Sequence, residues 1–247
     1  DDFRLIIAWL LAALRPQGPF PLLALAGEPG TSKTSTATLL RSLIDPHIAG
    51  IRRPPKEERD LFICASKSAA LVYDNLSSIP EWLSDGLCVV ATGGTFAARA
   101  LRTDGDEALF TVEKPVMITS VGEVISRSDL ADRAMVVTLT AIPEASRMTK
   151  AAFNAILDSA RPRILGSLLD GVSQGLANVT KVNLQRLPRM ADFITWAQAC
   201  ETAFWPAGTI HAAFDRNVAD AVEGVLEGDA VAVALRKWFD KRDQEAW

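Results

Sequence analysis

The 247-residue sequence predicts an α/β fold up to about residue 145, followed by an all-helical remainder. Short apolar runs alternate with helical segments in the first part, which is typical of a sheet covered by helices. After Pro143 the apolar periodicity is helical and runs of β-branched residues almost vanish. Apolar residues make up 49% of the chain, enough for a sizeable core. We therefore expect two parts, residues 1–145 and residues 146–247.

Each element of the first part has its own local signal. The expected elements are, in chain order, a helix over 2–14, a strand over 22–26, a helix over 35–43, strands over 61–67 and 69–75, a helix over 78–92, a hairpin within 92–112, a strand over 115–121, a helix over 122–132 and a strand over 134–140. The helices have apolar residues at helical spacing, and Pro80 suits a first turn. The strands are short apolar runs, and the sequence TDGDE between two extended pieces predicts the hairpin turn.

The second part contains three amphipathic segments. They cover residues 153–176, 189–204 and 214–239, and the last is expected to break near Gly228. We expect these helices to form a lid or C-terminal domain after the sheet.

Composition excludes several classes of protein. There is no eighteen-residue apolar run and no signal peptide, so we expect no membrane association. Three widely spaced cysteines predict reduced thiols in a cytoplasmic protein, and the two histidines lie on unrelated segments, which argues against a zinc site. The net charge is −4, so nucleic-acid binding would depend on local basic groups. The chain starts DDFRLI without Met, which indicates a piece of a longer protein.

The stretch LLALAGEPGTSKTSTATLL approximates a phosphate-binding loop between a strand and a helix. Gly27, Lys33 and Thr34 keep the spacing of that motif, but Ser32 stands where it requires glycine. In such loops backbone N–H groups and the lysine hold phosphates, and the hydroxyl after the lysine holds Mg²⁺. The alternative is a Gly-Pro turn before a Lys-Thr helix start. The predicted nucleotide-binding residues here are Gly27, Glu28, Pro29, Gly30, Thr31, Ser32, Lys33, Thr34 and Ser35.

A second acidic group follows about forty residues later. The apolar run SAALVYDNL ends in Asp74, which is suited to hold Mg²⁺ together with Thr34. Asn75 follows where most such ATPases have glutamate; an amide cannot take a proton, but it can orient water. The alternative is a strand end closed by Asp-Asn turn chemistry.

The order of the later segments resembles superfamily 3 helicases and their AAA+ relatives, notably the ATPase parts of phage and plasmid primase-helicase proteins. That order is phosphate loop, strand ending in Asp, TGG with a basic hairpin, polar-ended strand, and an arginine before a last strand. The sequences LIDP, DNLSSIPEWLSDGLC, ATGG, DLADRA and LPRMADF carry the resemblance. It implies a P-loop NTPase, AAA+-like, with a three-layer α/β/α core, a parallel sheet and a helical C-terminal part.

The resemblance also implies roles for individual residues. Lys33, Asp74, Asn75 and Arg133 would be catalytic, with Arg133 as an arginine finger that reaches the ATP of a neighbouring subunit. Arg189 would contact nucleotide as a lid arginine. Thr119, with Ser120, stands where the family often has a γ-phosphate-sensing asparagine. Arg99 and Arg102 would face single-stranded DNA. The implied cofactors are ATP and Mg²⁺, and the implied partners are single-stranded DNA, further copies in a ring of which a hexamer is one option, and flanking domains such as a primase.

The arginines also have interpretations that involve no function. Arg99 and Arg102 could be solvated, and Arg133 could form an internal ion pair with Asp129 or Asp132. We therefore carry two hypotheses: a DNA helicase or translocase driven by ATP hydrolysis, and a slowly hydrolysing switch, initiator or loader. The absence of a glutamate after Asp74 favours the second, and the basic hairpin favours the first. A small-molecule kinase is a weaker third.

Overall fold

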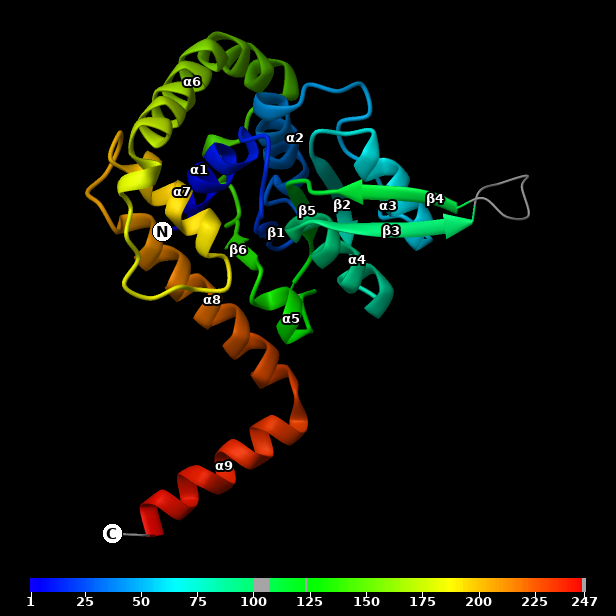
Figure 1. Ribbon diagram of the computed structural model, residues 1–247, viewed down its shortest axis with the longest axis vertical. Coiled ribbons are helices and arrows are strands. Elements are labelled where there is room, and N and C mark those ends of the chain that lie inside the picture. Colours follow the sequence, from blue (N-terminus) through cyan, green and yellow to red (C-terminus); the bar gives the residue numbers. More distant parts are fainter. Residues whose placement is uncertain (100–106, 123, 246–247) are drawn as a thin grey trace.

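The computed structural model of the chain describes residues 1–99, 107–122 and 124–245. Its centre is a parallel sheet with the strand order β2-β5-β1-β6 (Figure 1). These strands are β1 (Leu22–Ala26), β2 (Leu71–Leu76), β5 (Val116–Ser120) and β6 (Ala134–Thr138). Helices cover both faces of the sheet, and the predicted α/β class with a parallel sheet and a helical C-terminal part is confirmed.

Alternation along the strands divides the core into two layers. Leu23 and Leu25 of β1 pack into one apolar cluster, whereas Leu22 and Ala24 pack into another on the opposite face. All five residues of β1 are buried, as expected of a central parallel strand that is covered on both sides. The helices around the first cluster are α1 (Asp2–Ala13), α2 (Lys33–Ile44), α7 (Ala191–Glu201) and α8 (Thr209–Gly228). The second cluster is covered by α3 (Glu58–Ser66), α4 (Glu81–Thr92), α5 (Ser128–Ala131) and the hairpin of β3 (Gly94–Arg99) and β4 (Glu107–Val112).

Two predicted elements are wrong. A strand was expected over residues 61–67, but residues 61–66 lie in α3, because Leu61, Phe62 and Ala65 fall on one side of the helix and are all buried. Phe62 stacks on Phe96 of the hairpin, with ring centroids 4.5 Å apart. The helix expected over 122–132 is reduced to α5, and Gly122 has φ +74, which lies outside the helical region. The predicted hairpin is confirmed, with β3 and β4 antiparallel.

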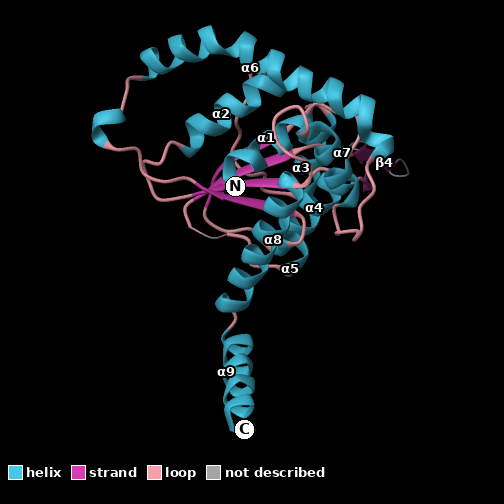
Figure 2. Cartoon of the chain, turned by 90° about the vertical axis from the view of Figure 1, so that its left-hand side faces the viewer, coloured by secondary structure: helices cyan, strands magenta, loops and turns pink. Residues whose placement is uncertain are grey.

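The C-terminal part is helical as predicted. Helix α6 (Lys150–Asn178) runs 29 residues through Pro162 and arches over α1 and α7 (Figure 1). The chain breaks at Asp229, next to the predicted Gly228, between α8 and α9 (Ala230–Glu245). Figure 2 shows α9 extending away from the body of the molecule.

Helix α1 joins the two predicted parts in space. Its Trp9 is fully buried, and the indole N–H of Trp196 in α7 donates to the carbonyl of Leu11 at 3.0 Å. The first cluster therefore contains residues from both sides of the predicted boundary after residue 145. The division into a core of residues 1–145 and a helical lid or C-terminal domain of residues 146–247 stays a prediction. Within the described ranges, no helix is both long and apolar enough to cross a bilayer.

Candidate functional site

Three strands deliver polar residues to one edge of the sheet. Because β1, β2 and β5 are parallel, their carboxyl ends lie at the same edge. The loop that begins at Gly27 follows β1 and leads into α2, while Asp74 and Asn75 lie near the end of β2 and Thr119 near the end of β5. The predicted loop, second acid and sensor position therefore belong to one site.

The loop requires unusual backbone conformations at three places. Gly27 has φ +148, and a Cβ there would lie 2.6 Å from the carbonyl oxygen of Leu139. Gly30 has φ +86, and Ser32 has φ 62. Ser32 thus adopts the left-handed conformation in which glycine is preferred, at a cost that a non-glycine residue must bear. This explains why the motif has glycine at this position.

Lys33 lies inside the loop. Its Nζ donates to the carbonyl oxygens of Gly27 at 2.7 Å and Glu28 at 2.8 Å. The side chain of Thr31 also donates to the Glu28 carbonyl, at 2.9 Å. Lys33 is 9% exposed. The loop therefore surrounds the Lys33 ammonium group at the N-terminus of α2. The residues exposed to solvent around it are Glu28, Pro29, Thr34 and Ser35.

The second acid meets the loop. The hydroxyl of Thr34 lies 3.0 and 3.2 Å from the two carboxylate oxygens of Asp74, although forty residues separate them. The Thr119 hydroxyl donates to Oδ1 of Asp74 at 2.6 Å, and it accepts the backbone N–H of Asn75 at 2.8 Å. Four predicted residues are thus joined by direct hydrogen bonds. A hydroxyl facing a carboxylate beside an ammonium group is an arrangement that can hold a hard cation and phosphate oxygens.

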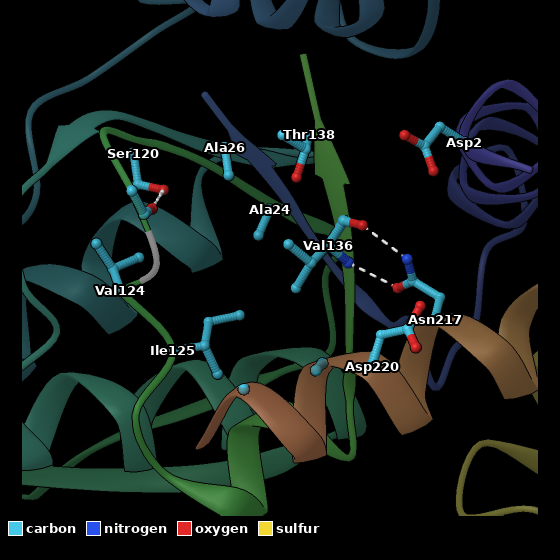
Figure 3. A pocket seen from close by; sticks show the side chains of 13 residues that line it. Asp2, Ala24, Ala26, Ser120, Val124, Ile125, Val136, Thr138, Asn217 and Asp220 are labelled. Atoms are coloured by element: carbon cyan, nitrogen blue, oxygen red, sulfur yellow. Dashed lines mark hydrogen bonds between the residues drawn. The ribbon is translucent and has the colours of Figure 1, made fainter. Parts of the chain in front are cut away.

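A cavity of about 240 Å³ lies behind this edge (Figure 3). The small side chains of Ala24 and Ala26 leave the sheet face hollow, and Asp2 and Asp220 lie at its rim. The side-chain amide of Asn217 in α8 accepts from the Val136 N–H at 2.8 Å and donates to its carbonyl at 2.7 Å. That amide therefore covers the outer edge of β6. Sequence reasoning missed this group, because nothing near Asn217 in the chain signals a strand partner.

Arg133 and Arg189 lie together at the opposite end of the sheet. The carbonyl of Arg133 accepts the N–H of Leu22 at 2.9 Å, at the amino end of β1. Asp129 pairs with Arg133 and, at 2.6 Å, with Arg189, which also contacts Asp132 at 3.3 Å. The hydrogen bond from Arg133 is the main reason why the pKa of Asp129 is lowered. The internal ion pair with Asp129 that the sequence left open is present, and Arg189 lies beside Arg133, away from its own loop.

Of the predicted DNA-binding pair Arg99 and Arg102, the structure describes Arg99 alone. Arg99 ends β3, where it is paired with Glu107 of β4. Arg102 lies outside the described residues. The hairpin extends away from the sheet, and β4 contacts α3 (Figure 1).

Comparisons with known proteins agree with this fold. The chain is similar in structure to the active helicase SCCmec type IV Cch, with a TM-score of 0.51 and 14% identity over 98% of this chain and 52% of that chain. It is also similar to the C-terminal region of NrS-1, with a TM-score of 0.49 and 16% identity over 64% of this chain and 38% of that chain. The chain thus spans about half the length of the Cch protein. None of the curated proteins gives a significant match.

A family comparison covers most of the sequence. Residues 2–220 match the family described as actinomycete integrative conjugative element replication proteins. The matched range includes the loop after β1, the ends of β2 and β5, and the arginine cluster. The helicase-like fold and the match over this range lead to one conclusion: the chain belongs to the family of actinomycete integrative conjugative element replication proteins.

Proposed function

We propose that this replication protein binds ATP with Mg²⁺ and hydrolyses it to translocate on DNA or unwind it. One observation supports this most: Lys33, Thr34, Asp74 and Asn75 meet at one edge of the sheet, although they come from two distant segments. A simple Gly-Pro turn would not require these contacts. Together the four side chains provide a cation, a hydroxyl, a carboxylate and an amide in one place.

The residues present fit ATP and Mg²⁺. The loop N–H groups and Lys33 would hold the phosphates, because an ammonium inside a loop at a helix N-terminus attracts anions. Thr34 and Asp74 would hold Mg²⁺, which prefers oxygen ligands, and the ion would neutralise phosphate charge. The exposed Asn75 amide would orient the attacking water. Gly30 leaves the space above the loop open, since no atom lies within 4 Å of the position where its Cβ would stand.

Assembly would complete the site. β1 has five residues, so Arg133 is about 16 Å from its own loop at a rise of about 3.3 Å per residue, too far for an arginine side chain. Arg133 would instead reach a nucleotide held by the next copy in a head-to-tail ring, and Arg189 would approach with it. We propose that single-stranded DNA contacts the hairpin through Arg99 and Arg102, and that flanking domains such as a primase complete the full-length protein.

A second candidate is a nucleotide-controlled initiator or loader that hydrolyses slowly. Two observations favour it. The exposed residue beside Asp74 is an amide, Asn75, which cannot remove a proton, and Asp129 holds Arg133 within the chain. In this case ATP binding would change assembly, and turnover would be slow with or without DNA.

ATP titration tests the loop, and turnover separates the two candidates. Lys33→Ala should abolish ATP binding because it removes the charge inside the loop, whereas Lys67→Ala, at an exposed site after α3, should bind as the wild type does. Ser32→Gly should bind as well or better, since it relieves the left-handed conformation. Unchanged affinity in Lys33→Ala would show that the loop is not a phosphate site. Stimulation of turnover by single-stranded DNA supports the motor, and slow, DNA-independent turnover supports the switch.

A further inference from the structure

The strand β2 is irregular at the point where it carries the site. Tyr73 pairs with Ile118 and Leu76 with Ser120, so Asp74 and Asn75 together oppose the single residue between those partners. This is a β-bulge, which disrupts the ladder and re-aims side chains. Asn75 adopts φ 60 within it, and its N–H is therefore directed away from the regular ladder and needs another acceptor.

Thr119 provides that acceptor. It is the residue of β5 opposite the bulge, and it is 1% exposed. A hydroxyl has one proton to donate and two lone pairs that accept. The Thr119 oxygen accepts a hydrogen bond from the Asn75 N–H at 2.8 Å, and its O–H donates one to Asp74 Oδ1 at 2.6 Å. The second distance is in the range of hydrogen bonds to an ionised carboxylate.

The direction of these bonds decides what Thr119 can do. Because its one proton is engaged in the hydrogen bond to Asp74, the Thr119 hydroxyl has none left to donate to a phosphate oxygen. The same Asp74 carboxylate faces Thr34 at 3.0 and 3.2 Å. The buried Thr119 side chain thus fixes two groups of the site. It orients the Asp74 carboxylate, which faces Thr34, and it holds the backbone of Asn75, whose side-chain amide is exposed.

We propose that Thr119 is a positioning residue: it orients Asp74 toward Thr34 and holds Asn75 in its left-handed conformation. It does not contact the nucleotide. The functional consequence rests on the proposed ATP hydrolysis, but the structural link exists in the protein alone. A direct phosphate contact, the role expected from the position of Thr119 in the sequence, would require the hydroxyl to release Asp74.

The first experiment measures the link without nucleotide. Amide hydrogen exchange at Asn75, followed by NMR, compares the wild type with Thr119→Val, Thr119→Ser and the control Thr195→Val. Valine keeps the shape and loses the hydroxyl, serine keeps the hydroxyl, and the Thr195 hydroxyl donates to the Ala191 carbonyl within α7. Exchange at Asn75 should accelerate about tenfold or more in Thr119→Val alone, because its N–H loses its acceptor. Equal exchange in wild type and Thr119→Val would overturn the proposal.

The second experiment separates positioning from phosphate contact. In Thr119→Val the Mg²⁺ concentration for half-maximal turnover should rise and kcat should fall, each by about 10- to 100-fold, the usual worth of a hydrogen bond to a charged group. ATP affinity measured without Mg²⁺ should stay unchanged, and Thr119→Ser should restore the wild-type values. Weaker Mg²⁺-free ATP binding in Thr119→Val, with the Mg²⁺ requirement unchanged, would overturn positioning in favour of direct contact.

The two proposals fail in different ways. If even the wild type binds no ATP, the proposed function fails, while the exchange measurement still decides whether Thr119 holds the bulge. If the wild type binds and hydrolyses ATP and Thr119→Val behaves identically in exchange, Mg²⁺ requirement and kcat, then only the role of Thr119 is refuted.

Discussion

Arg133 and Lys33 lie at opposite ends of β1, which makes a mixing experiment decisive. If Arg133 acts on the nucleotide of the next subunit, Arg133→Ala and Lys33→Ala should each be inactive alone. A mixture of the two contains interfaces that combine an intact loop with an intact arginine. We expect the mixture to recover turnover, because no single chain has to provide both groups.

Magnitudes show that the internal ion pair does not prevent this role. An arginine finger contributes about three to five orders of magnitude in rate, which corresponds to about 4 to 7 kcal/mol. The pair with Asp129 joins side chains that are 17% and 44% exposed, and a pair of that kind is worth about 1 kcal/mol or less. Releasing Arg133 from Asp129 therefore costs far less than the finger would contribute.

The assay is steady-state ATP turnover at a concentration that supports assembly. With random mixing in equal amounts, about one interface in four pairs an intact loop with an intact arginine in a head-to-tail ring, so about a quarter of wild-type turnover is expected. Arg161→Ala, which affects a partly exposed arginine of α6, should keep full turnover alone. No recovery on mixing, together with a lower melting temperature of Arg133→Ala, would refute the argument and leave Arg133 as an internal ion-pair partner.

Three further predictions concern the sheet edge, the arginine cluster and the hairpin. Asn217→Ala should lower the free energy of unfolding by about 1 to 3 kcal/mol, measured by urea titration, since it removes two hydrogen bonds to the edge strand; an unchanged midpoint would contradict this. The lowered pKa of Asp129 gives stability that is present above the unfolded carboxyl pKa and lost as pH falls through the folded value, below about pH 4; thermal unfolding of Asp129→Asn should lack this loss and converge with wild type in acid. Arg99→Ala with Arg102→Ala should spare basal turnover, weaken single-stranded DNA binding and flatten its salt dependence, because fewer counterions are released; unchanged binding in a salt series would exclude the hairpin as the DNA contact.

Local sequence was sufficient for the loop and the central strands. The spacing from Gly27 to Thr34 between an apolar run and a helix predicts the strand, turn and helix that are observed, since every signal lies within twenty residues. The run that ends in Asp74 likewise predicts β2. Local signals were not sufficient for residues 61–67, because a short apolar run fits a strand or a buried helix equally well, and only packing against α4 and the hairpin selects the helix.

The connections within the site required the tertiary structure. Thr34 and Asp74 are forty residues apart, and Thr119 is forty-five from Asp74; only the order of parallel strands brings their side chains into contact. The same sheet separates Arg133 from the loop of its own chain, because Arg133 precedes its strand and the loop follows β1. Sequence alone determined which residues are candidates for the chemistry. The direction and pairing of the strands decided which of these residues lie together. In a parallel sheet, the residues that follow the strands gather at one end, and the residues that precede them gather at the other end.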